Sequence, residues 1–159
     1  MLVKTRAGFT LLEMLIALSI IGVLTGLGVF ILRPSYAYIF SNDFRAMVQQ
    51  ARFEAIKRNL PVAVVRDGQQ YATLVKDDAA INCTTANSTQ INVKRADEYR
   101  DVQVSDSDTT GTGNGIVWLP TGLARACDGS GVVTGTAAFT SRNITAKVII
   151  SQAGRVRTE

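Results

Sequence analysis

Two arginines near the end of the chain are the side chains with the clearest chemical potential. Arg155 and Arg157 stand two residues apart in ISQAGRVRTE. A strand that continues through them would project both from one side, with Val156 opposite. Paired guanidinium groups suit phosphate, which they bind through two parallel hydrogen bonds. Gly154 permits a turn or a close backbone approach, and Lys147 adds charge. We therefore predict a phosphate-binding site at these positions; the alternative is an ordinary strand with solvated arginines at its end.

Other chemistries find little support in the composition. The chain contains no histidine, so a serine or cysteine nucleophile would lack its usual base. The loop from Asp106 to Asn114 could hold Ca²⁺, but its spacing is not that of an EF-hand and no bidentate glutamate follows. We expect no catalytic residue, no metal and no cofactor. The net charge of +4 does not by itself demand a nucleic-acid partner.

The first third of the chain contains a long apolar run. The residues from Phe9 to Leu32 carry one charge, Glu13, and as a helix they would span ~36 Å against a hydrocarbon core of ~30 Å. Lys4 and Arg6 before the run favour a cytoplasmic N-terminus. We expect a membrane helix over 9–32. The simplest interpretation is an uncleaved signal anchor whose carboxylate reaches the headgroups, since a charge at the membrane centre costs at least ~2.5 kcal/mol.

A second helix is predicted over 33–60, with Pro34 as a kink or break near its start. Its apolar residues recur at steps of three and four, which indicates an amphipathic helix. This stripe would cover a sheet of the same chain or, alternatively, a partner helix in a filament. The apolar positions are Phe40, Phe44, Met47, Val48, Ala51, Ala55, Ile56 and Leu60.

From residue 61 onward the apolar pattern alternates with period two, as in strands. PVAVVR and QQYATLVK, joined at Asp67-Gly68, predict a β-hairpin. Further candidate strands are QINVK, RDVQV, GIVWL, VVTGTAAFT and ITAKVIIS. We predict an α+β fold in which a long N-terminal hydrophobic helix packs on a C-terminal, all-antiparallel β domain, residues 61–159.

The two cysteines, Cys83 and Cys127, both fall in the part expected to be exported. An oxidising compartment favours one disulfide between them. It would close a loop of about 45 residues, worth roughly 4 kcal/mol in the chain-entropy model. Two unpaired thiols are the alternative.

The stretch Gly8-Phe9-Thr10-Leu11-Leu12-Glu13 resembles the processing site of type IV pilins and pseudopilins. The resemblance implies that a prepilin peptidase removes the leader, residues 1–8, after Gly8 and that Phe9 is then N-methylated. It also implies that Glu13 meets the new amine of a neighbouring subunit during assembly.

Three further stretches, QQARFEAIKRNLPVAV, IVWLPTGLA and VIISQAGRVR, resemble the GspH/FimT group of pseudopilins and minor pilins. The resemblance implies a single-pass inner-membrane protein with a periplasmic domain, built into a fibre with other pilin subunits at an inner-membrane assembly platform.

In FimT-like minor pilins a Gly-Arg-x-Arg motif is associated with DNA capture during natural transformation, and residues 154–157 match it. The expected function is therefore a minor pilin that aids pilus assembly and binds DNA without sequence preference. A type II secretion pseudopilin that binds no DNA is the first alternative. A membrane-anchored β domain that binds peptides or sugars and never polymerises is the second.

Overall fold

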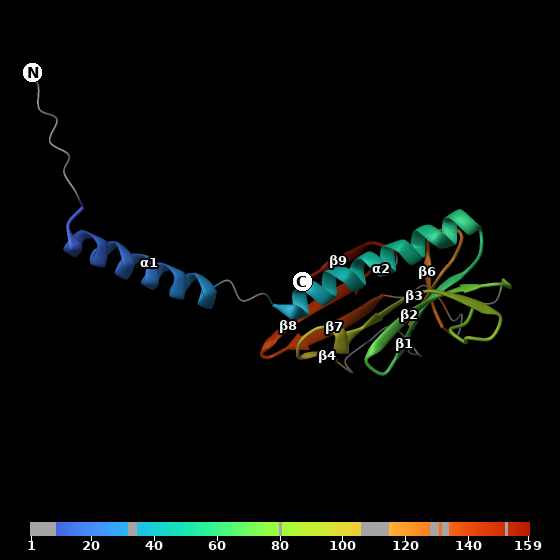
Figure 1. Ribbon diagram of the computed structural model, residues 1–159. Helices are drawn as coiled ribbons and strands as arrows, with labels where there is room; N and C mark the ends of the chain where they lie inside the picture. Colours follow the sequence, from blue (N-terminus) through green and yellow to red (C-terminus); the bar gives the residue numbers. More distant parts are fainter. Residues whose placement is uncertain are drawn as a thin grey trace, which may run out of the picture. The chain divides into compact units, whose positions relative to one another are not determined.

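The computed structural model describes residues 9–31, 35–79, 81–105, 115–127, 131, 134–151 and 153–159, with side chains of 28–31 excepted. The chain divides into two compact units, Met1–Pro34 and Ser35–Glu159 (Figure 1). The loop considered for Ca²⁺, Gly8 and Pro34 lie outside the described residues.

The described residues of the first unit form helix α1, Leu11–Ile31, after the short segment 9–10. All its described side chains, which run to Leu27, are exposed, as is Phe9 before it. Within the part of the chain that the structure describes, none of the helices has the combination of length and apolar character that crossing a membrane requires.

The second unit begins with helix α2, Tyr36–Arg58. Ser35 before it is extended, at φ −80° and ψ 107°, so a single helix does not run unbroken from residue 9 to residue 60. Asn59 ends the helix in the left-handed conformation, a common helix C-terminal signal.

The predicted apolar stripe of α2 is buried, with two exceptions. Ile56 is 50% exposed, and Leu60 is only partly buried against the core. Phe53, on the solvent side of the helix, is 63% exposed. Arg52, at the edge of this face, is half-buried. The periodicity therefore located the buried face correctly but misplaced residues at its edges. The buried apolar residues of α2 are Ala37, Phe40, Phe44, Met47, Val48, Ala51 and Ala55.

In the part of the chain that the structure describes, nine strands form two antiparallel sheets. Sheet A has the order β3-β2-β1-β5-β6 and sheet B the order β4-β7-β8-β9. A short 3₁₀ helix, η1 (Ala96–Glu98), precedes β4. The strands of sheet A are β1 (Val62–Asp67), β2 (Gln70–Lys76), β3 (Ser88–Arg95), β5 (Gly115–Trp118) and β6 (Ala124–Ala126). Those of sheet B are β4 (Val102–Val104), β7 (Gly135–Ser141), β8 (Ile144–Ile150) and β9 (Val156–Thr158).

Most predicted strands are confirmed, including the β1–β2 hairpin. Its turn lies one residue later than expected, because Asp67 pairs with Gln70 and Gly68 adopts the positive φ of +59°. Strands β6 and β9 were not predicted as separate elements. Each has three residues, which is too few to show a clear period of two.

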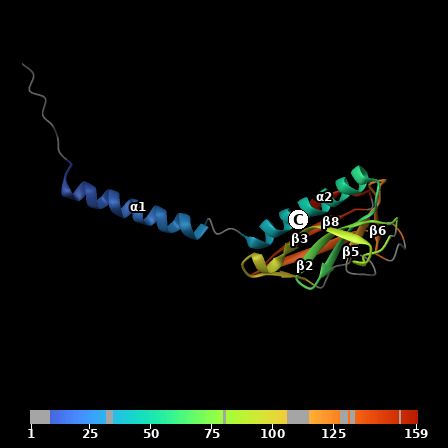
Figure 2. The same cartoon turned by 45° about the vertical axis from the view of Figure 1, so that its right-hand side comes forward.

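Helix α2 packs against strands of both sheets and forms the core with them; Figures 1 and 2 show it running along them from two directions. Phe139 of β7 lies between two aromatic residues of the helix, with ring centroids 4.8 Å from Phe40 and 5.2 Å from Phe44. Phe44 also contacts Tyr71 of β2, at 4.4 Å. The predicted α+β fold, a helix on antiparallel sheets, is confirmed.

The predicted disulfide is present, with the Cα atoms of Cys83 and Cys127 5.0 Å apart. Cys83 packs on a second apolar cluster of buried sheet A residues, so the bridge holds the β2–β3 loop against this sheet. That cluster consists of Ala63, Leu74 and Val117.

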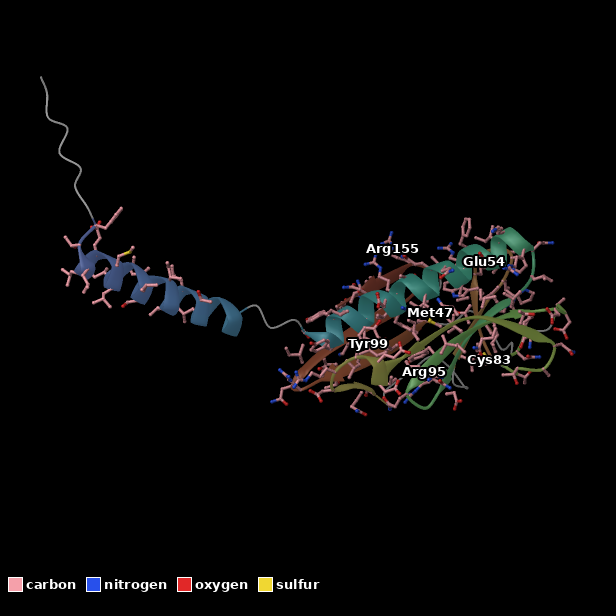
Figure 3. The ribbon with its side chains drawn as sticks, in the orientation of Figure 1. Met47, Glu54, Cys83, Arg95, Tyr99 and Arg155 are labelled. Atoms are coloured by element: carbon pink, nitrogen blue, oxygen red, sulfur yellow. A yellow bond between two sulfur atoms is a disulfide. The ribbon has the colours of Figure 1, made fainter. Side chains whose placement is uncertain are left out.

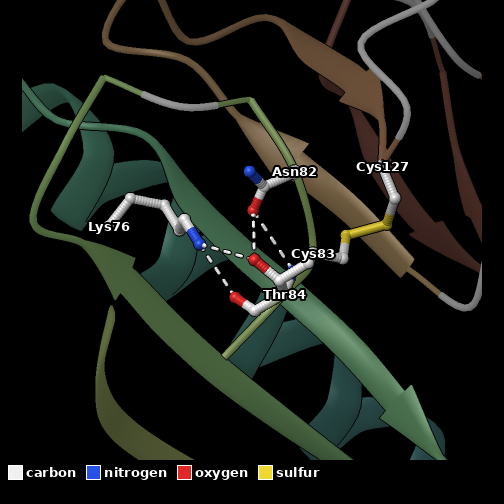
Figure 4. Close-up of a disulfide and its surroundings, with 5 residues drawn as sticks. All are labelled: Lys76, Asn82, Cys83, Thr84 and Cys127. Carbon is white, nitrogen blue, oxygen red and sulfur yellow. Dashed lines mark hydrogen bonds between the residues drawn. A yellow bond between two sulfur atoms is a disulfide. The ribbon is translucent and has the colours of Figure 1, made fainter. Parts of the chain in front are cut away.

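A buried lysine supports the same loop (Figure 4). Lys76 is fully buried, and its Nζ donates hydrogen bonds to the carbonyl oxygens of Thr84, at 2.8 Å, and Ala86, at 3.0 Å. A buried ammonium group needs such acceptors, because its transfer from water is otherwise very costly. Lys76 and the disulfide thus fix the loop at neighbouring points.

Candidate functional site

The two arginines predicted to bind phosphate lie on and beside β9, a separate strand at the edge of sheet B. We expected the strand to continue straight from β8 through the arginines, but it does not. It turns, with the N–H of Gly154 donating to the Ser151 carbonyl (2.8 Å) and the N–H of Ser151 donating to the Arg155 carbonyl (2.9 Å). Gly154 has φ +74°, a conformation that glycine adopts most readily.

Alternation nevertheless places both arginines as predicted relative to Val156. Arg155 and Arg157 are exposed, whereas Val156 is 5% exposed and belongs to the core. In Figure 3, Arg155 projects away from the body of its unit. Its guanidinium makes no ion pair among the described residues.

The register of β8 and β9 adds Lys147 to the same face. Arg157 is opposite Ile149, and Lys147 exchanges two backbone hydrogen bonds with Glu159, at 2.7 and 2.8 Å. Residues directly opposed in an antiparallel pair project to the same side. Lys147 is exposed there, so the structure brings together the three predicted basic residues.

A shallow hollow of about 430 Å³ lies on this face. Arg155, Arg157 and the apolar side chain of Ile149 are among the residues that line it. Such a surface can accept an anionic group at the arginines. The remaining lining residues are Thr134, Ile150, Ser151 and Ala153.

Gly154 has a packing role of its own. A Cβ atom at this position would lie 2.9 Å from the Gly122 carbonyl oxygen and 3.0 Å from Cζ3 of Trp118. It would also lie 3.0 Å from Cζ of Arg52, whose Nη1 donates to the Gly154 carbonyl oxygen at 2.9 Å. Because a Cβ atom here would overlap the backbone of Gly122 and crowd the Trp118 ring, the absence of a side chain at Gly154 serves the packing of the turn.

Sequence reasoning missed the importance of Arg52. Its guanidinium carbon lies 5.7 Å from the ring centroid of Trp118, within cation–π range. Arg52 also lies beside Gly122. Arg52 belongs to the first of the three stretches that carried the GspH/FimT resemblance. It contacts the second through Trp118 and Gly122 and the third through Gly154. The arginine among buried alanines in QQARFEA was the available signal.

Strand β9 is also held at its other end. Thr158 Oγ1 donates to Oδ1 of Asn42 on α2 at 3.5 Å, a long hydrogen bond. Together with the Arg52 contact and the burial of Val156, this fixes the strand along the helix. The exposed arginines thus lie on a segment that packing and hydrogen bonds hold against the helix, and binding sites depend on such support.

The predicted assembly residue, Glu13, lies in the first turn of α1. Its N–H donates to Oγ1 of Thr10 at 3.2 Å, and the N–H of Met14 donates to the Thr10 carbonyl at 3.2 Å. Thr10 therefore caps the helix, and Thr-x-x-Glu is the spacing of a capping box. Sequence reasoning overlooked this signal. A carboxylate here also interacts favourably with the helix dipole.

A polar cluster joins α2 to the segment before β4. The Tyr99 hydroxyl donates to Oδ2 of Asp43, and Lys94 Nζ lies 3.8 Å from the same carboxylate oxygen. Burial, followed by the bond to Asp43, raises the pKa of Tyr99 to about 12. This contact has a structural role, because Asp43 lies on α2 and Tyr99 lies just before β4, and the hydrogen bond between them ties these two parts of the core together.

The acidic residues of the β2–β3 loop make hydrogen bonds within the chain. Asp77 accepts one from Thr89 and Asp78 one from Asn87, both at 3.4 Å. Across the described ranges there is no group of three or more His, Cys, Asp or Glu side chains that could hold a metal ion.

A helix packed on two antiparallel sheets, preceded by an apolar helix, defines the pilin-like class of proteins. Residues 41–154 match the family described as type II transport protein GspH, and residues 3–29 match the prokaryotic N-terminal methylation motif. The chain belongs to the GspH family of pilin-like proteins.

Known proteins agree with this assignment. The chain is 32% identical to the pilin-like protein PilA1 of Thermus thermophilus over 161 residues, which cover 98% of this chain and 99% of that protein. Two solved structures share the fold at 14% identity. The minor pseudopilin EpsH from the type 2 secretion system of Vibrio cholerae has a TM-score of 0.58, with 79% of this chain and 97% of that one covered. The type IV minor pilin FimU of Pseudomonas aeruginosa has a TM-score of 0.54, with 77% and 87% covered.

Proposed function

We propose that this protein is a minor pilin that enters a type IV pilus-type fibre and captures DNA through Arg155, Arg157 and Lys147. The observation that carries the proposal is the placement of these three side chains on one exposed face of sheet B. Phosphate is the matching ligand, since guanidinium groups bind it in a bidentate manner. Contacts of this kind fix the backbone of DNA and read no sequence.

The N-terminal segment would supply insertion and assembly. The apolar run of residues 9–32 extends beyond the described side chains of α1, and we propose that it resides in the inner membrane, with the second unit in the periplasm. A prepilin peptidase would cut after Gly8, and the methylated amine of Phe9 would stay positively charged. Pairing of this amine with Glu13 of a neighbouring subunit would offset the cost of a carboxylate in an apolar fibre core.

The expected affinity of one subunit is low. Neutralising about two phosphates gives a slope near −1.8 in a plot of log K against log salt. Lys147 adds at most one further contact. Useful capture therefore requires several subunits along one DNA molecule, since linked sites raise the effective concentration.

Fluorescence polarisation with a labelled DNA duplex tests this function on the full chain in a non-ionic detergent. We expect Arg155→Ala/Arg157→Ala to bind much more weakly than the wild type at low salt, with a shallower salt slope. Arg95→Ala/Arg100→Ala, which removes two exposed arginines elsewhere, is the matched control. Equal binding by wild type and Arg155→Ala/Arg157→Ala would refute the site.

The alternative role is that of a type II secretion pseudopilin without DNA binding. The fold similarity to EpsH and the match to the GspH family favour it. This role predicts that the double arginine variant supports secretion as well as the wild type does. Secretion and transformation assays in a deletion strain, complemented with each variant, would separate the two roles.

A further inference from the structure

A carboxylate lies among the basic side chains of the proposed DNA site. Oε1 of Glu159 is 2.8 Å from Nη2 of Arg157. The backbone of Glu159 is fixed on β8 by its two hydrogen bonds with Lys147. Glu159 is exposed, as are Arg157 and Lys147, and the register places all three on one face. The Glu159 carboxylate therefore lies on the same face as the basic side chains of Arg157 and Lys147.

We propose that Glu159 is an intramolecular competitor, which occupies on Arg157 the position that a phosphate of DNA would take. The inference rests on the proposed function, because it concerns the regulation of the same site. Carboxylate and phosphate present similar oxygen acceptors to a guanidinium group. Binding of DNA at Arg157 thus exchanges one anion for another.

The exposure of the pair determines how strongly it competes. The side chains of Arg157 and Glu159 are 62% and 51% exposed, and solvent-exposed ion pairs of this kind are weak. Glu159 therefore lowers the affinity of the site without blocking it. Arg155, whose guanidinium makes no ion pair within the described ranges, remains open and makes the first contact.

A weak competitor favours long polyanions over single anions. At Arg157, a free phosphate ion must displace Glu159 using one interaction, whereas a DNA molecule held by Arg155 and by neighbouring subunits presents the next phosphate at high effective concentration. Arg157 of each subunit thus responds little to dissolved anions, and the subunits bind DNA collectively in the fibre. The ligand selected is a polymer of phosphates.

The test is DNA binding by Glu159→Gln, measured by polarisation with a labelled duplex on the full chain in non-ionic detergent. Removal of the carboxylate should tighten binding about two- to fivefold at low salt and steepen the salt slope by up to about 0.9. Glu98→Gln is the matched control. It removes one exposed carboxylate from η1, which contacts β4 at the opposite edge of sheet B.

Each outcome decides between the proposals. Tighter binding by Glu159→Gln than by both wild type and Glu98→Gln supports the competitor, including the case in which the wild type itself binds too weakly to measure. Equal binding by Glu159→Gln and Glu98→Gln overturns the competitor; loss of binding in Arg155→Ala/Arg157→Ala would then leave the DNA site standing. No binding by wild type or Glu159→Gln would overturn both, because removing the carboxylate would expose no anion site.

Discussion

Nη1 of Arg52 on helix α2 lies 2.9 Å from the carbonyl oxygen of Gly154, at the turn that leads into β9. The two residues are 102 positions apart in the chain. This hydrogen bond, together with the contact of Arg52 with Trp118, holds the turn that leads to the exposed Arg155 and Arg157. The Gly-Arg-Val-Arg stretch therefore combines a packing residue with two surface residues.

Arg52→Ala should lower the free energy of unfolding by about 2–3 kcal/mol. It removes a charged hydrogen bond and a cation–π contact. Urea unfolding monitored by tryptophan fluorescence measures the change. Gln49→Ala, at an exposed position of the same helix, should change stability by less than about 0.5 kcal/mol. Equal urea midpoints for wild type and Arg52→Ala would show that the contact is not formed in solution.

Gly154→Ala should destabilise the second unit more than Gly68→Ala does. Both glycines have positive φ, so both substitutions carry the conformational cost of about 1–2 kcal/mol. Only Gly154 also lies where a Cβ atom would overlap backbone, whereas nothing lies within 4 Å of a Cβ at Gly68. The difference in urea midpoint between the variants reports the packing contribution. A larger loss in Gly68→Ala would contradict this structure of the turn.

If Glu13 has the assembly role proposed above, Glu13→Ala should reduce incorporation into the fibre, because the proposed pairing with the amine of a neighbouring subunit would be lost. Membrane insertion should be unchanged or improved, since an intramembrane charge is costly. Recovery in sheared fibre and membrane fractions measures the two steps. Thr10→Ala, which removes the helix cap at a cost of about 1 kcal/mol, tests whether the first turn alone matters. Equal losses in both variants would assign Glu13 a capping role only.

Reduction of the Cys83–Cys127 disulfide should lower stability by about 4 kcal/mol, from its separation of 44 residues. Thermal unfolding of the wild type with and without dithiothreitol measures this loss. Cys83→Ser/Cys127→Ser is the control, and its unfolding should be insensitive to the reductant. Unchanged wild-type stability after complete reduction, verified by thiol titration, would mean that Lys76 and packing hold the loop alone.

Stability should fall as the pH rises from about 10 to about 12. The pKa of Tyr99 is raised from 10.0 to about 12 in the folded state, so the unfolded chain releases this proton first. The contribution of Tyr99 to the free energy of unfolding is fully present below pH 10, and it is lost as the pH rises above the pKa of Tyr99 in the folded state. Urea unfolding at pH 9 and pH 11 should show a smaller decrease for Tyr99→Phe than for the wild type. An identical decrease in both would exclude Tyr99 as the cause.

Local patterns carried most of the fold prediction. Period three to four over residues 33–60 and period two from residue 61 onward recovered α2, the β1–β2 hairpin and most remaining strands, because amphipathic burial imposes those periods. Strands β6 and β9 were not predicted, because each has three residues, too few to show a period of two. Ile56 was wrongly placed in the buried stripe because the width of the covered face depends on what packs on it.

The sequence by itself indicated the class of this protein, through the motif at Gly8 to Glu13 and the three stretches that resemble the GspH/FimT group, and it predicted the alternation that places Arg155 and Arg157 on one side of Val156. These features depend on neighbours along the chain. Only the tertiary structure decided that Gly154 packs on Arg52 and Trp118, that Lys147 lies on the face of Arg157, and that Glu159 pairs with that arginine. Turn geometry and strand register set these relationships, and register has no signature in a single strand.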